Sequence, residues 1–446
     1  MTAFHAKRLP RQLGPAAWSE ILPGRPPASP LTADTTADFV IIGGGFAGLS
    51  AARRLALLQP GARIMVLDAG RIAEGAAGRN SGFMIDLPHD LQSDDYAGPG
   101  DDRAMTTLNR QAIGFARDAV QDYGINPAFF DPVGKINGAA SELADGHNAS
   151  YARHLTDLNE PHERLDAQSM HQITGSRHYQ SGLFTPGTVM LQPAGYIRGL
   201  ANGLARAGVV IHENTAVTGF GRTGRDWTVQ TAHAQVTTPR VILANNGHLE
   251  SFGFERGRLM HLFLYAVMTP DLTPDQLAAL GGQPRWGITP SDPMGTTVRR
   301  IDSAQGGNRI ITRTCASLRP GMVASPAGLA RARRIMQGKF DARFPALAGM
   351  RMEHAWAGQL CLSLNSVSVM KPLEDGIFAA CVQNGLGTAR GTLTGIGAAE
   401  LACGESSDIT RHFTAQDRPR KLPPQPFQTL GANATIRFKE WRARNE

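Results

Sequence analysis

The stretch ADFVIIGGGFAGL at residues 37–49 decides the fold of this chain. It reads as a short apolar strand that runs into the pattern G-x-G-x-x-G, formed by Gly43, Gly45 and Gly48, and then into a helix. Gly43 permits the tight turn, Gly45 lets the backbone approach a pyrophosphate, and Gly48 lets the helix pack closely on the strand. The stretch therefore predicts a dinucleotide-binding turn, with the phosphates at the helix N-terminus.

The residues after this turn supply the context that a lone glycine pattern lacks. Apolar residues recur at helical spacing over 49–58, and after a break at Gly61 the segment 63–67 reads as a second strand that ends at Asp68. A carboxylate at this position, twenty residues past Gly48, is suited to accept hydrogen bonds from the ribose hydroxyls of an adenosine. The order strand, turn, helix, strand and acid predicts a Rossmann-type unit.

The segment GAAGRNSGF at residues 75–83 indicates which dinucleotide is bound. An NAD-binding domain would normally continue as a helix here, whereas this segment is small, polar and rich in glycine. It resembles the loop that passes under the FAD pyrophosphate in the D-amino-acid oxidase and sarcosine oxidase superfamily, and is most similar to gamma-glutamylputrescine oxidase-like members, which read G-A-S-G-R-N-G-G. The two differences, Ala77 and Ser81, are small residues that still allow close passage of a cofactor. A surface loop rich in turn residues is the alternative.

Later segments extend the resemblance. Residues 191–217 read as a helix and a strand, 227–237 as a hairpin, and 241–247 as a buried parallel strand. Near the C-terminus, the family's W-x-G strand is matched by 356–358 and its G-x-G turn by 385–387. The resemblance implies that this turn lies by the flavin pyrimidine ring, where backbone N–H groups and a helix end stabilise negative charge. Two positions depart from the family pattern: Leu386 stands where the family often has His, and Ser368 stands where it usually has Pro. We expect the turn still to bind the cofactor, but any role of that His is absent.

The resemblance implies FAD as the cofactor and a set of residues that bind it. These residues are Gly43, Gly45, Phe46, Ala47, Gly48, Asp68, Ala69, Arg71, Ala77, Gly78, Arg79, Asn80, Ser81, Gly82, Val217, Ala244, Trp356, Gly358, Gly385, Leu386, Gly387 and Thr388. Some sarcosine oxidase-like relatives attach the flavin to a cysteine in the strand region of Cys361, but a free buried thiol is the commoner state of such a cysteine.

The resembling segments span 37–404 and imply an α/β fold with two domains. We expect a discontinuous Rossmann-type FAD-binding domain over 37–90, 190–250 and 350–405. A second, α+β substrate domain is expected over 91–189 and 251–349, with strands at 259–269 and 308–316 in an antiparallel sheet over the flavin. Residues 1–36 and 406–446 would be terminal extensions, the second with an extended segment at 419–426 and a short basic helix near 437–444. A length of 446 residues with 42% hydrophobic composition agrees with about two or three domains.

Composition and charge exclude several other classes of protein. The first 36 residues hold six prolines and no apolar run, so we expect neither a membrane span nor a secretory sequence there. We therefore expect a cytoplasmic enzyme. The chain has no C-x-x-C and no H-x-x-x-H, which predicts neither a disulfide framework nor a metal site. The net charge of +7 is dispersed and accompanies no nucleic-acid-binding motif. It indicates an arginine-rich surface or, less readily, a positive funnel for an anionic substrate.

Candidate substrate contacts lie on the expected antiparallel sheet, and they are His261, Tyr265, Arg299, Arg300 and Arg313. An arginine there could bind a carboxylate or phosphonate through two parallel hydrogen bonds. Solvated or structural arginines are common at strand ends, and a buried histidine is most often structural. We select His261, Tyr265 and Arg313 as the catalytic candidates.

The resemblance implies an oxidase of a primary or secondary amine or an amino acid. Oxidised flavin accepts a hydride at N5, the resulting imine hydrolyses, and O2 is reduced to H2O2. A general base is not required if the amine binds in its neutral form. Two alternatives stay open: a dehydrogenase of the same fold that passes electrons to a quinone or carrier, and a non-catalytic FAD-binding protein, which the residues at 368 and 386 favour. Fold resemblance leaves the identity of the amine open.

Overall fold

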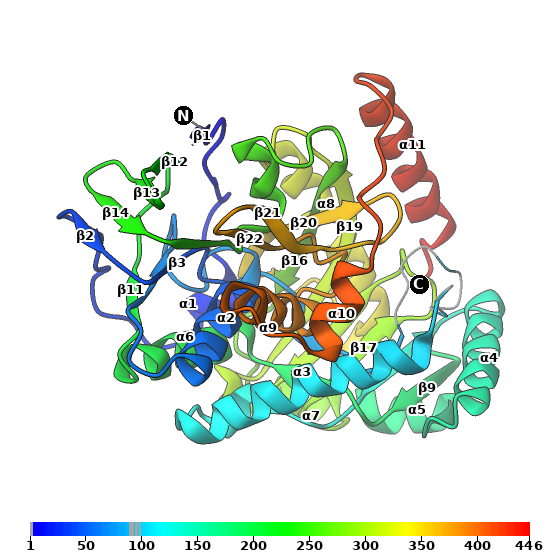
Figure 1. Ribbon diagram of the computed structural model, residues 1–446. Coiled ribbons are helices and arrows are strands. Elements are labelled where there is room, and N and C mark those ends of the chain that lie inside the picture. Colours follow the sequence, from blue (N-terminus) through cyan, green and yellow to red (C-terminus); the bar gives the residue numbers. More distant parts are fainter. Residues whose placement is uncertain (1–2, 89–92, 94–96, 98–99) are drawn as a thin grey trace.

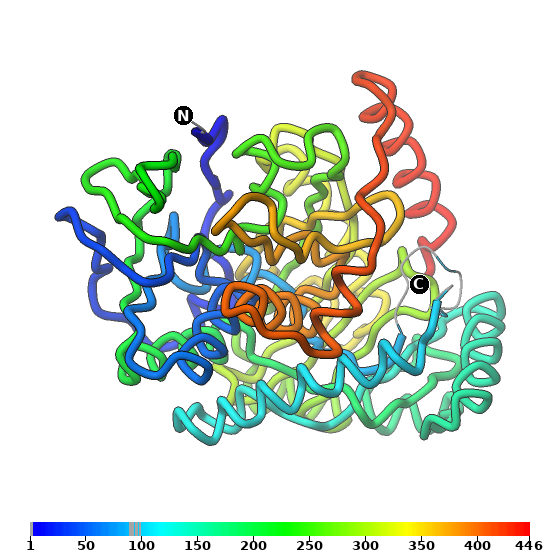
Figure 2. Tube along the Cα trace, viewed as in Figure 1, coloured from blue at the N-terminus to red at the C-terminus, as the bar shows by residue number. Residues whose placement is uncertain are grey.

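The computed structural model describes residues 3–88, 93, 97 and 100–446 (Figures 1 and 2). Two large β-sheets organise these residues, one of six strands and one of eight, with helices packed around them. Two smaller sheets complete the β-structure of the described part. The mixed α/β class is the one that the sequence predicts.

The six-stranded sheet is the Rossmann-type unit. Its strand order is β11 (Val210–His212), β4 (Ile64–Leu67), β3 (Phe39–Ile42), β15 (Arg240–Leu243), β22 (Ile377–Cys381) and β21 (Val369–Glu374). All neighbours pair in parallel except β21 with β22. Every residue of β3 and β4 is buried, as expected for parallel strands that are covered on both faces. The expected strands around 40, 65 and 242, which are far apart in the sequence, therefore meet in one sheet.

Two helices pack closely together beside this sheet. They are α2 (Phe46–Leu58), which follows the glycine turn, and α9 (Ala389–Cys403), which follows the second glycine turn. A Cβ atom on Gly395 of α9 would lie 2.1 Å from the carbonyl oxygen of Ala47, so only glycine permits this approach. The contact brings the two glycine turns, which are more than 300 residues apart, to the same side of the sheet.

The eight-stranded sheet forms the second layer. Its order is β20 (His354–Ser363), β16 (Leu259–Met268), β19 (Arg309–Leu318), β18 (Thr297–Ile301), β17 (Trp286–Pro290), β7 (Lys135–Ala139), β9 (Ser181–Thr185) and β8 (Glu163–Asp166). Strands β16 and β19 fall where the sequence predicts them and are antiparallel. We expected β20 in the FAD-binding domain, yet it pairs with β16 along its whole length. The chain therefore crosses between the layers inside 350–405.

Helix α8 (Pro326–Arg343) covers one face of the eight-stranded sheet, with Met336 and Phe340 buried in the core. Further helices are α3 (Asp102–Asp122), α4 (Glu142–Asp157), α5 (Ala167–Thr174), α6 (Pro193–Arg206), α7 (Pro274–Leu280) and α10 (Asp408–Thr414). None of the described helices is both long and apolar enough to cross a membrane.

The small sheets account for the shorter predicted strands. One has the order β1 (Ala3–His5), β12 (Gly219–Thr223), β13 (Asp226–Gln230), β14 (Gln235–Thr238) and β2 (Thr35–Thr36), and contains the predicted hairpin. The other joins β5 (Phe83–Met84), β10 (Val189–Leu191) and β6 (Phe130–Asp131). The strand expected up to residue 217 ends at His212, because Asn214 has a φ of 52°, which leaves the extended conformation.

Both terminal segments pack against the body. The N-terminal segment includes α1 (Ala17–Glu20), in which Trp18 is fully buried and donates from Nε1 to the carbonyl of Asn80 at 2.9 Å. Residues 417–424 form neither helix nor strand and are followed by a turn at 425–426. The C-terminal helix α11 (Phe427–Arg442) comes next and is longer than the helix that the sequence predicts. It stands at the margin of the molecule in Figures 1 and 2.

Candidate active site

A large cavity lies between the carboxyl ends of the parallel strands and one face of the eight-stranded sheet. Its walls include residues just after β3, β4, β15 and β22, and residues of β16, β19 and β20. In open parallel sheets, ligands bind in the crevice at the carboxyl ends of the strands. The cavity is therefore where the fold places a dinucleotide.

The three glycines of the first turn have different roles. Gly43 has a φ of 111°, and a Cβ there would lie 2.7 Å from the carbonyl oxygen of Ala244. A Cβ on Gly48 would lie 1.8 Å from the carbonyl oxygen of Gly43, so this glycine permits close packing of helix on strand. Gly45 lines the cavity, and a Cβ there would meet only Ala77, at an ordinary 3.6 Å. The space in front of Gly45 is open for a phosphate group.

Asp68 stands at the end of β4 on the cavity wall. Its Oδ2 accepts a hydrogen bond from the Gly44 N–H at 2.7 Å, and its Oδ1 accepts one from the Gly70 N–H at 2.9 Å. Desolvation by burial raises the pKa of Asp68, and these two backbone hydrogen bonds act in the opposite direction. Each oxygen keeps a second lone pair, which fits the expected acceptance of ribose hydroxyls.

Arg79 fixes the loop under the cavity. Its Nε donates to the carbonyl of Glu74 at 2.6 Å, its Nη1 to Ala357 at 3.2 Å, and its Nη2 to Gly14. Burial lowers the pKa of Arg79 to about 10. Because its donors are used by one carbonyl of the same loop and by carbonyls of two distant segments, we assign Arg79 a positioning role for the loop, although it borders the cavity.

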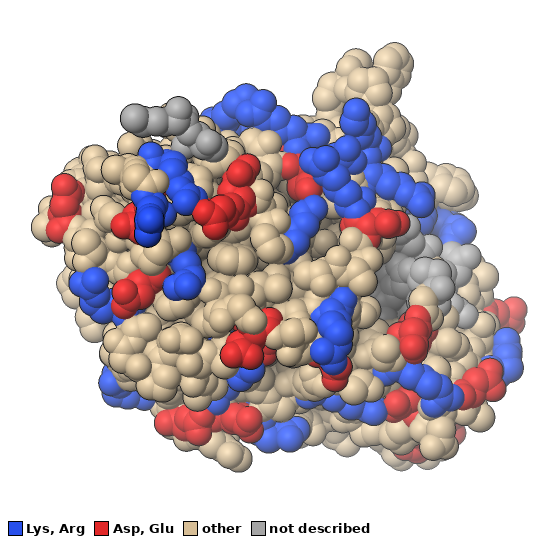
Figure 3. All heavy atoms as spheres, in the orientation of Figure 1, with Lys and Arg blue, Asp and Glu red and all other residues tan. Residues whose placement is uncertain are grey.

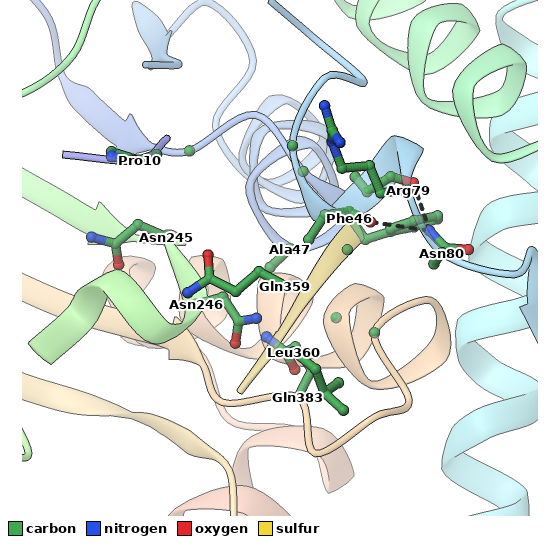
Figure 4. Close-up of a pocket in the computed structure, with 18 of the residues that line it drawn as sticks. Pro10, Phe46, Ala47, Arg79, Asn80, Asn245, Asn246, Gln359, Leu360 and Gln383 are labelled. Atoms are coloured by element: carbon green, nitrogen blue, oxygen red, sulfur yellow. Dashed lines mark hydrogen bonds between the residues drawn. The ribbon is translucent and has the colours of Figure 1, made fainter. Parts of the chain in front are cut away.

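The cavity is lined by most of the residues that the resemblance implies for FAD. They are Gly43, Gly45, Phe46, Ala47, Asp68, Ala69, Ala77, Arg79, Asn80, Ser81, Gly82, Val217, Ala244, Gly358, Gly385, Leu386, Gly387 and Thr388. Figure 4 draws Phe46, Arg79 and Asn80 on one side of this space, across from the amides of Asn246, Gln359 and Gln383. Segments of the chain that were expected to share one ligand thus share one cavity.

Four residues of the implied set do not line the cavity. Gly48 packs against the turn as described above. A Cβ on Gly78 would lie 1.8 Å from the carbonyl of Ala73. Trp356 donates from Nε1 to the carbonyl of Arg79 at 3.1 Å, and Arg71 contacts Pro26 and Glu213. Cys361 also lies off the cavity, fully buried in an apolar cluster, where burial raises the pKa of its thiol well above the usual value.

Two of the three catalytic candidates have their polar groups engaged away from the cavity. His261 does not line it, and its Nε2 lies 2.6 Å from Oε2 of Glu250. Tyr265 borders the cavity, but its hydroxyl is 2.7 Å from Oγ of Ser317, and a Cβ on Gly328 of α8 would lie 2.6 Å from it. Alternate residues of a strand face opposite sides, and on β16 Leu264 and Ala266 line the cavity. We therefore do not retain His261 and Tyr265 as substrate contacts.

The other arginine candidates are structural, because neither lines the cavity. Arg299 is buried and donates from Nη1 to the carbonyls of Ser81 at 3.0 Å and Leu191 at 2.6 Å. Arg300 donates to the carbonyl of Gly281. Arg299 thus holds the glycine-rich loop from its outer side, and burial lowers the pKa of its guanidinium to about 9.

Arg313 is the candidate that lies on the cavity. It stands on β19 opposite Ala266 of β16 and Thr297 of β18, and all three line the cavity. Its Nε donates to Oγ of Ser81 at 3.3 Å, next to the glycine-rich loop. The cavity face of the sheet therefore carries a guanidinium beside the expected cofactor loop.

Several residues that line the cavity were not predicted from the sequence as part of the site. They are Ala6, Arg8, Leu9, Pro10, Gln12, Asn245, Asn246, His248, Phe252, Thr289, Thr297, Gln359, Leu360 and Gln383. Asn245 and Gln383 follow the carboxyl ends of β15 and β22, so the rule for parallel sheets could have identified them. No motif marks the N-terminal residues. Within the described residues, no cluster of His, Cys, Asp and Glu could hold a metal ion.

His248 makes a prediction about pH. Only 6% of this residue is exposed, and burial, with the neighbouring His261 acting in the same direction, lowers the pKa of His248 from the ordinary 6.5 to about 4. Between pH 6.5 and 4, His248 therefore binds a proton in the unfolded chain but stays neutral in the folded chain. This difference lowers the free energy of unfolding by up to about 3 kcal/mol as the pH falls. We expect unfolding by urea to show this loss in the wild type and a smaller one in His248→Gln. An equal loss in both would contradict the prediction.

Comparisons with known proteins agree with this geometry. The family model described as FAD dependent oxidoreductase matches residues 38–401. The gamma-glutamylputrescine oxidoreductase of Escherichia coli (strain K12) is 25% identical over 409 residues, which cover 90% of each chain. The probable oxidoreductase OrdL of Rhizobium meliloti (strain 1021) is 26% identical over 414 residues, covering 88% of this chain and 89% of the relative. The crystal structure of glycine oxidase from Geobacillus kaustophilus has the same fold, with a TM-score of 0.68 at 17% identity, over 84% of this chain and 96% of that one.

Proposed function

We propose a function from one premise: this chain belongs to the family of FAD-dependent oxidoreductases. The proposal is that the enzyme oxidises a primary or secondary amine or an amino acid to an imine, which water hydrolyses, with O2 as the electron acceptor and H2O2 as its product. Bound FAD would supply the acceptor for the hydride that leaves the C–H bond next to nitrogen. The supporting observation is that both glycine turns and Arg313 line one cavity. A relative named for an amine substrate, gamma-glutamylputrescine, supports the class of substrate.

The proposed cofactor contacts divide along the cavity. At one end, the N–H groups at the start of α2 would hold phosphates, and Asp68 would accept hydrogen bonds from a ribose. At the other end, the turn at 385–388 precedes α9, and Thr388 is fixed by a hydrogen bond from its Oγ1 to the carbonyl of Phe83 at 2.8 Å. The positive end of α9 would stabilise negative charge near this turn. Leu386 lines the cavity here, so this position offers an apolar contact in place of an imidazole.

The proposed substrate face has to orient an amine and keep it neutral. Leu264, Ala266 and Leu360 line the cavity with apolar surface, and Arg313 adds a positive charge. A cation next to an amine, in a poorly solvated cavity, lowers the amine's pKa and favours the neutral form, which has the lone pair that imine formation needs. Arg313 would at the same time bind a carboxylate of the substrate.

The test is spectroscopic. We expect the purified protein to show the flavin absorption band at about 450 nm. When a panel of amines is added in the absence of oxygen, one class of amine should bleach this band. Readmission of air should restore the band and release peroxide in proportion. Bleaching without peroxide would instead support the dehydrogenase that uses a quinone or carrier. Retained flavin that no amine bleaches would support the non-catalytic FAD-binding protein, and absence of flavin would overturn the assignment of the cavity.

A further inference from the structure

The C-terminal helix α11 exposes the side that a surface helix normally buries. Phe427, Leu430, Phe438 and Trp441 are each 60–70% exposed. Together with Ala434 they recur at three- and four-residue spacing, so they form one stripe along the helix. We call these five residues the α11 stripe. An apolar patch of this kind on a soluble protein marks an interaction site.

The opposite side of α11 is polar and is already used. Strand β18 stops pairing with β19 at Arg313, which leaves the later backbone groups of β19 without that neighbour. Asn433 accepts from the Leu318 N–H at 3.0 Å, and Glu440 accepts from the Ala316 N–H at 2.9 Å. Arg437 donates to the carbonyl of Ala316 at 3.1 Å. The helix therefore caps a strand edge with its polar face, and this fixes the stripe outward.

Both ends of the helix are also anchored. Ahead of α11, the Leu422 N–H donates to the carbonyl of Gly257 at 2.9 Å. Behind it, the side chain of Glu446 accepts from the Ala140 N–H at 3.0 Å, and its backbone oxygen accepts from Oγ1 of Thr296 at 2.8 Å. Turning the stripe inward would break these contacts and uncover the edge of β19. The contacts at both ends of α11 therefore fix the helix in the orientation that exposes the stripe.

The charges around the stripe identify what it fits. The segment 418–446 holds seven basic residues, Arg418, Arg420, Lys421, Arg437, Lys439, Arg442 and Arg444. Its two acidic residues, Glu440 and Glu446, are both poorly exposed and engaged in the contacts above. The Arg444 guanidinium carbon lies 4.8 Å from the ring centroid of Trp441. Figure 3 shows Lys and Arg atoms gathered below the projecting part of the molecule where Figure 1 places α11.

We propose that α11 docks this protein on the surface of an anionic phospholipid bilayer. The α11 stripe enters the boundary between headgroups and acyl chains, and the exposed Arg420, Lys421, Lys439 and Arg444 contact lipid phosphates. Arg418 and Arg437 are instead held in ion pairs with Glu255 and Glu440. Phe, Leu and Trp on one side with Lys and Arg around them are the composition of interfacial helices. Parallel pairing with a second copy is disfavoured, because it brings Arg437, Lys439 and Arg442 against the same residues of the other helix. The proposal does not depend on the proposed reaction.

Trp441 provides a direct measurement. Of the five tryptophans in the chain, Trp18, Trp227, Trp286 and Trp356 are buried, and Trp441 is exposed. We expect vesicles of phosphatidylglycerol to bind the full-length holoprotein at low salt, and brominated acyl chains to quench the fluorescence of Trp441. Vesicles of phosphatidylcholine should bind at least about 10-fold more weakly, and salt should weaken binding to phosphatidylglycerol.

A pair of variants separates the stripe from general exposure of apolar residues. Phe438→Ser with Trp441→Ser should weaken binding by about 10-fold or more, in a sedimentation assay that needs no tryptophan. The matched control is Leu57→Ser with Leu143→Ser, which changes two exposed leucines on α2 and α4 and should leave binding unchanged. Failure to bind phosphatidylglycerol, or equal binding by the stripe variant, overturns the proposal. So does a dimer in light scattering that the stripe variant dissociates, because the stripe would then be an interface between copies.

Discussion

Replacement of Gly45 by valine is expected to give a folded protein that binds FAD at least about 100-fold more weakly, a loss of about 2.8 kcal/mol. Gly45 lines the cavity, and a Cβ there would meet only Ala77, at 3.6 Å, so the protein itself has room for a side chain. The branched methyl groups would occupy the space that the turn leaves for a pyrophosphate, and would keep the backbone N–H groups at the start of α2 away from it. The substitution therefore removes binding without removing the fold.

Two further glycine variants make this prediction specific. Gly48→Ala should lower the melting temperature of the flavin-free protein, since its Cβ would lie 1.8 Å from the Gly43 carbonyl oxygen. Gly338→Val on α8, where a Cβ has open space, should leave FAD binding unchanged. The measurements are FAD titration by flavin fluorescence and the melting temperature of each flavin-free variant. If Gly45→Val purifies with stoichiometric flavin, the phosphates do not lie at this turn.

The dinucleotide turn could be predicted from the sequence because its determinants are local. A tight turn and a close helix-to-strand contact require glycine at fixed spacing, and the structure places Gly43 and Gly48 at those contacts. The order of later strands then identified 241–247 as part of the same sheet, where β15 pairs with β3. Steric requirements within a few residues are visible in a sequence without knowledge of the rest of the fold.

The substrate face could not be predicted in the same way. Strand β16 is covered on both sides, so its apolar residues do not show which face borders the cavity. The His261 ring and the Tyr265 hydroxyl are engaged away from the cavity, whereas Leu264 and Ala266 line it. The pairing of β16 with β19 also shifts at Cys315, whose φ is 65°, and such a bulge changes which residues stand opposite one another. These features depend on long-range pairing.

The contribution of the N-terminal segment to the cavity could not be predicted from the sequence either. Its prolines suppress any helical or strand periodicity, so the sequence suggested an extension. In the structure, the carbonyl of Gly14 accepts a hydrogen bond from Arg79, and Pro10 lies on the cavity wall (Figure 4). Contacts of backbone carbonyls leave no trace in residue type, because every residue has one.

Replacement of Arg313 by glutamine is expected to raise the KM for amine substrates that carry a carboxylate by about 100-fold. Arg313 is the candidate cation that the structure places on the cavity face of β19. Removing one partner of a hydrogen-bonded charge pair in a desolvated site costs about 2–5 kcal/mol. For amines of the same class without a carboxylate, the KM should change by less than about 3-fold, since nothing in such a substrate needs the guanidinium. Steady-state kinetics on matched pairs of amines with and without a carboxylate measure both values.

Two controls distinguish recognition of substrate from support of the loop, because Arg313 also donates from Nε to Oγ of Ser81. Ser81→Ala removes that hydrogen bond and should leave the preference for carboxylates intact. Arg313→Lys keeps the charge but loses the planar pair of donors, so the KM of carboxylate substrates should fall between those of the wild type and Arg313→Gln. An equal rise of KM for both kinds of amine, with an altered flavin spectrum, would mean that Arg313 only positions the loop. The substrate would then not be anchored through a carboxylate at this position, and the amine end alone would have to orient it.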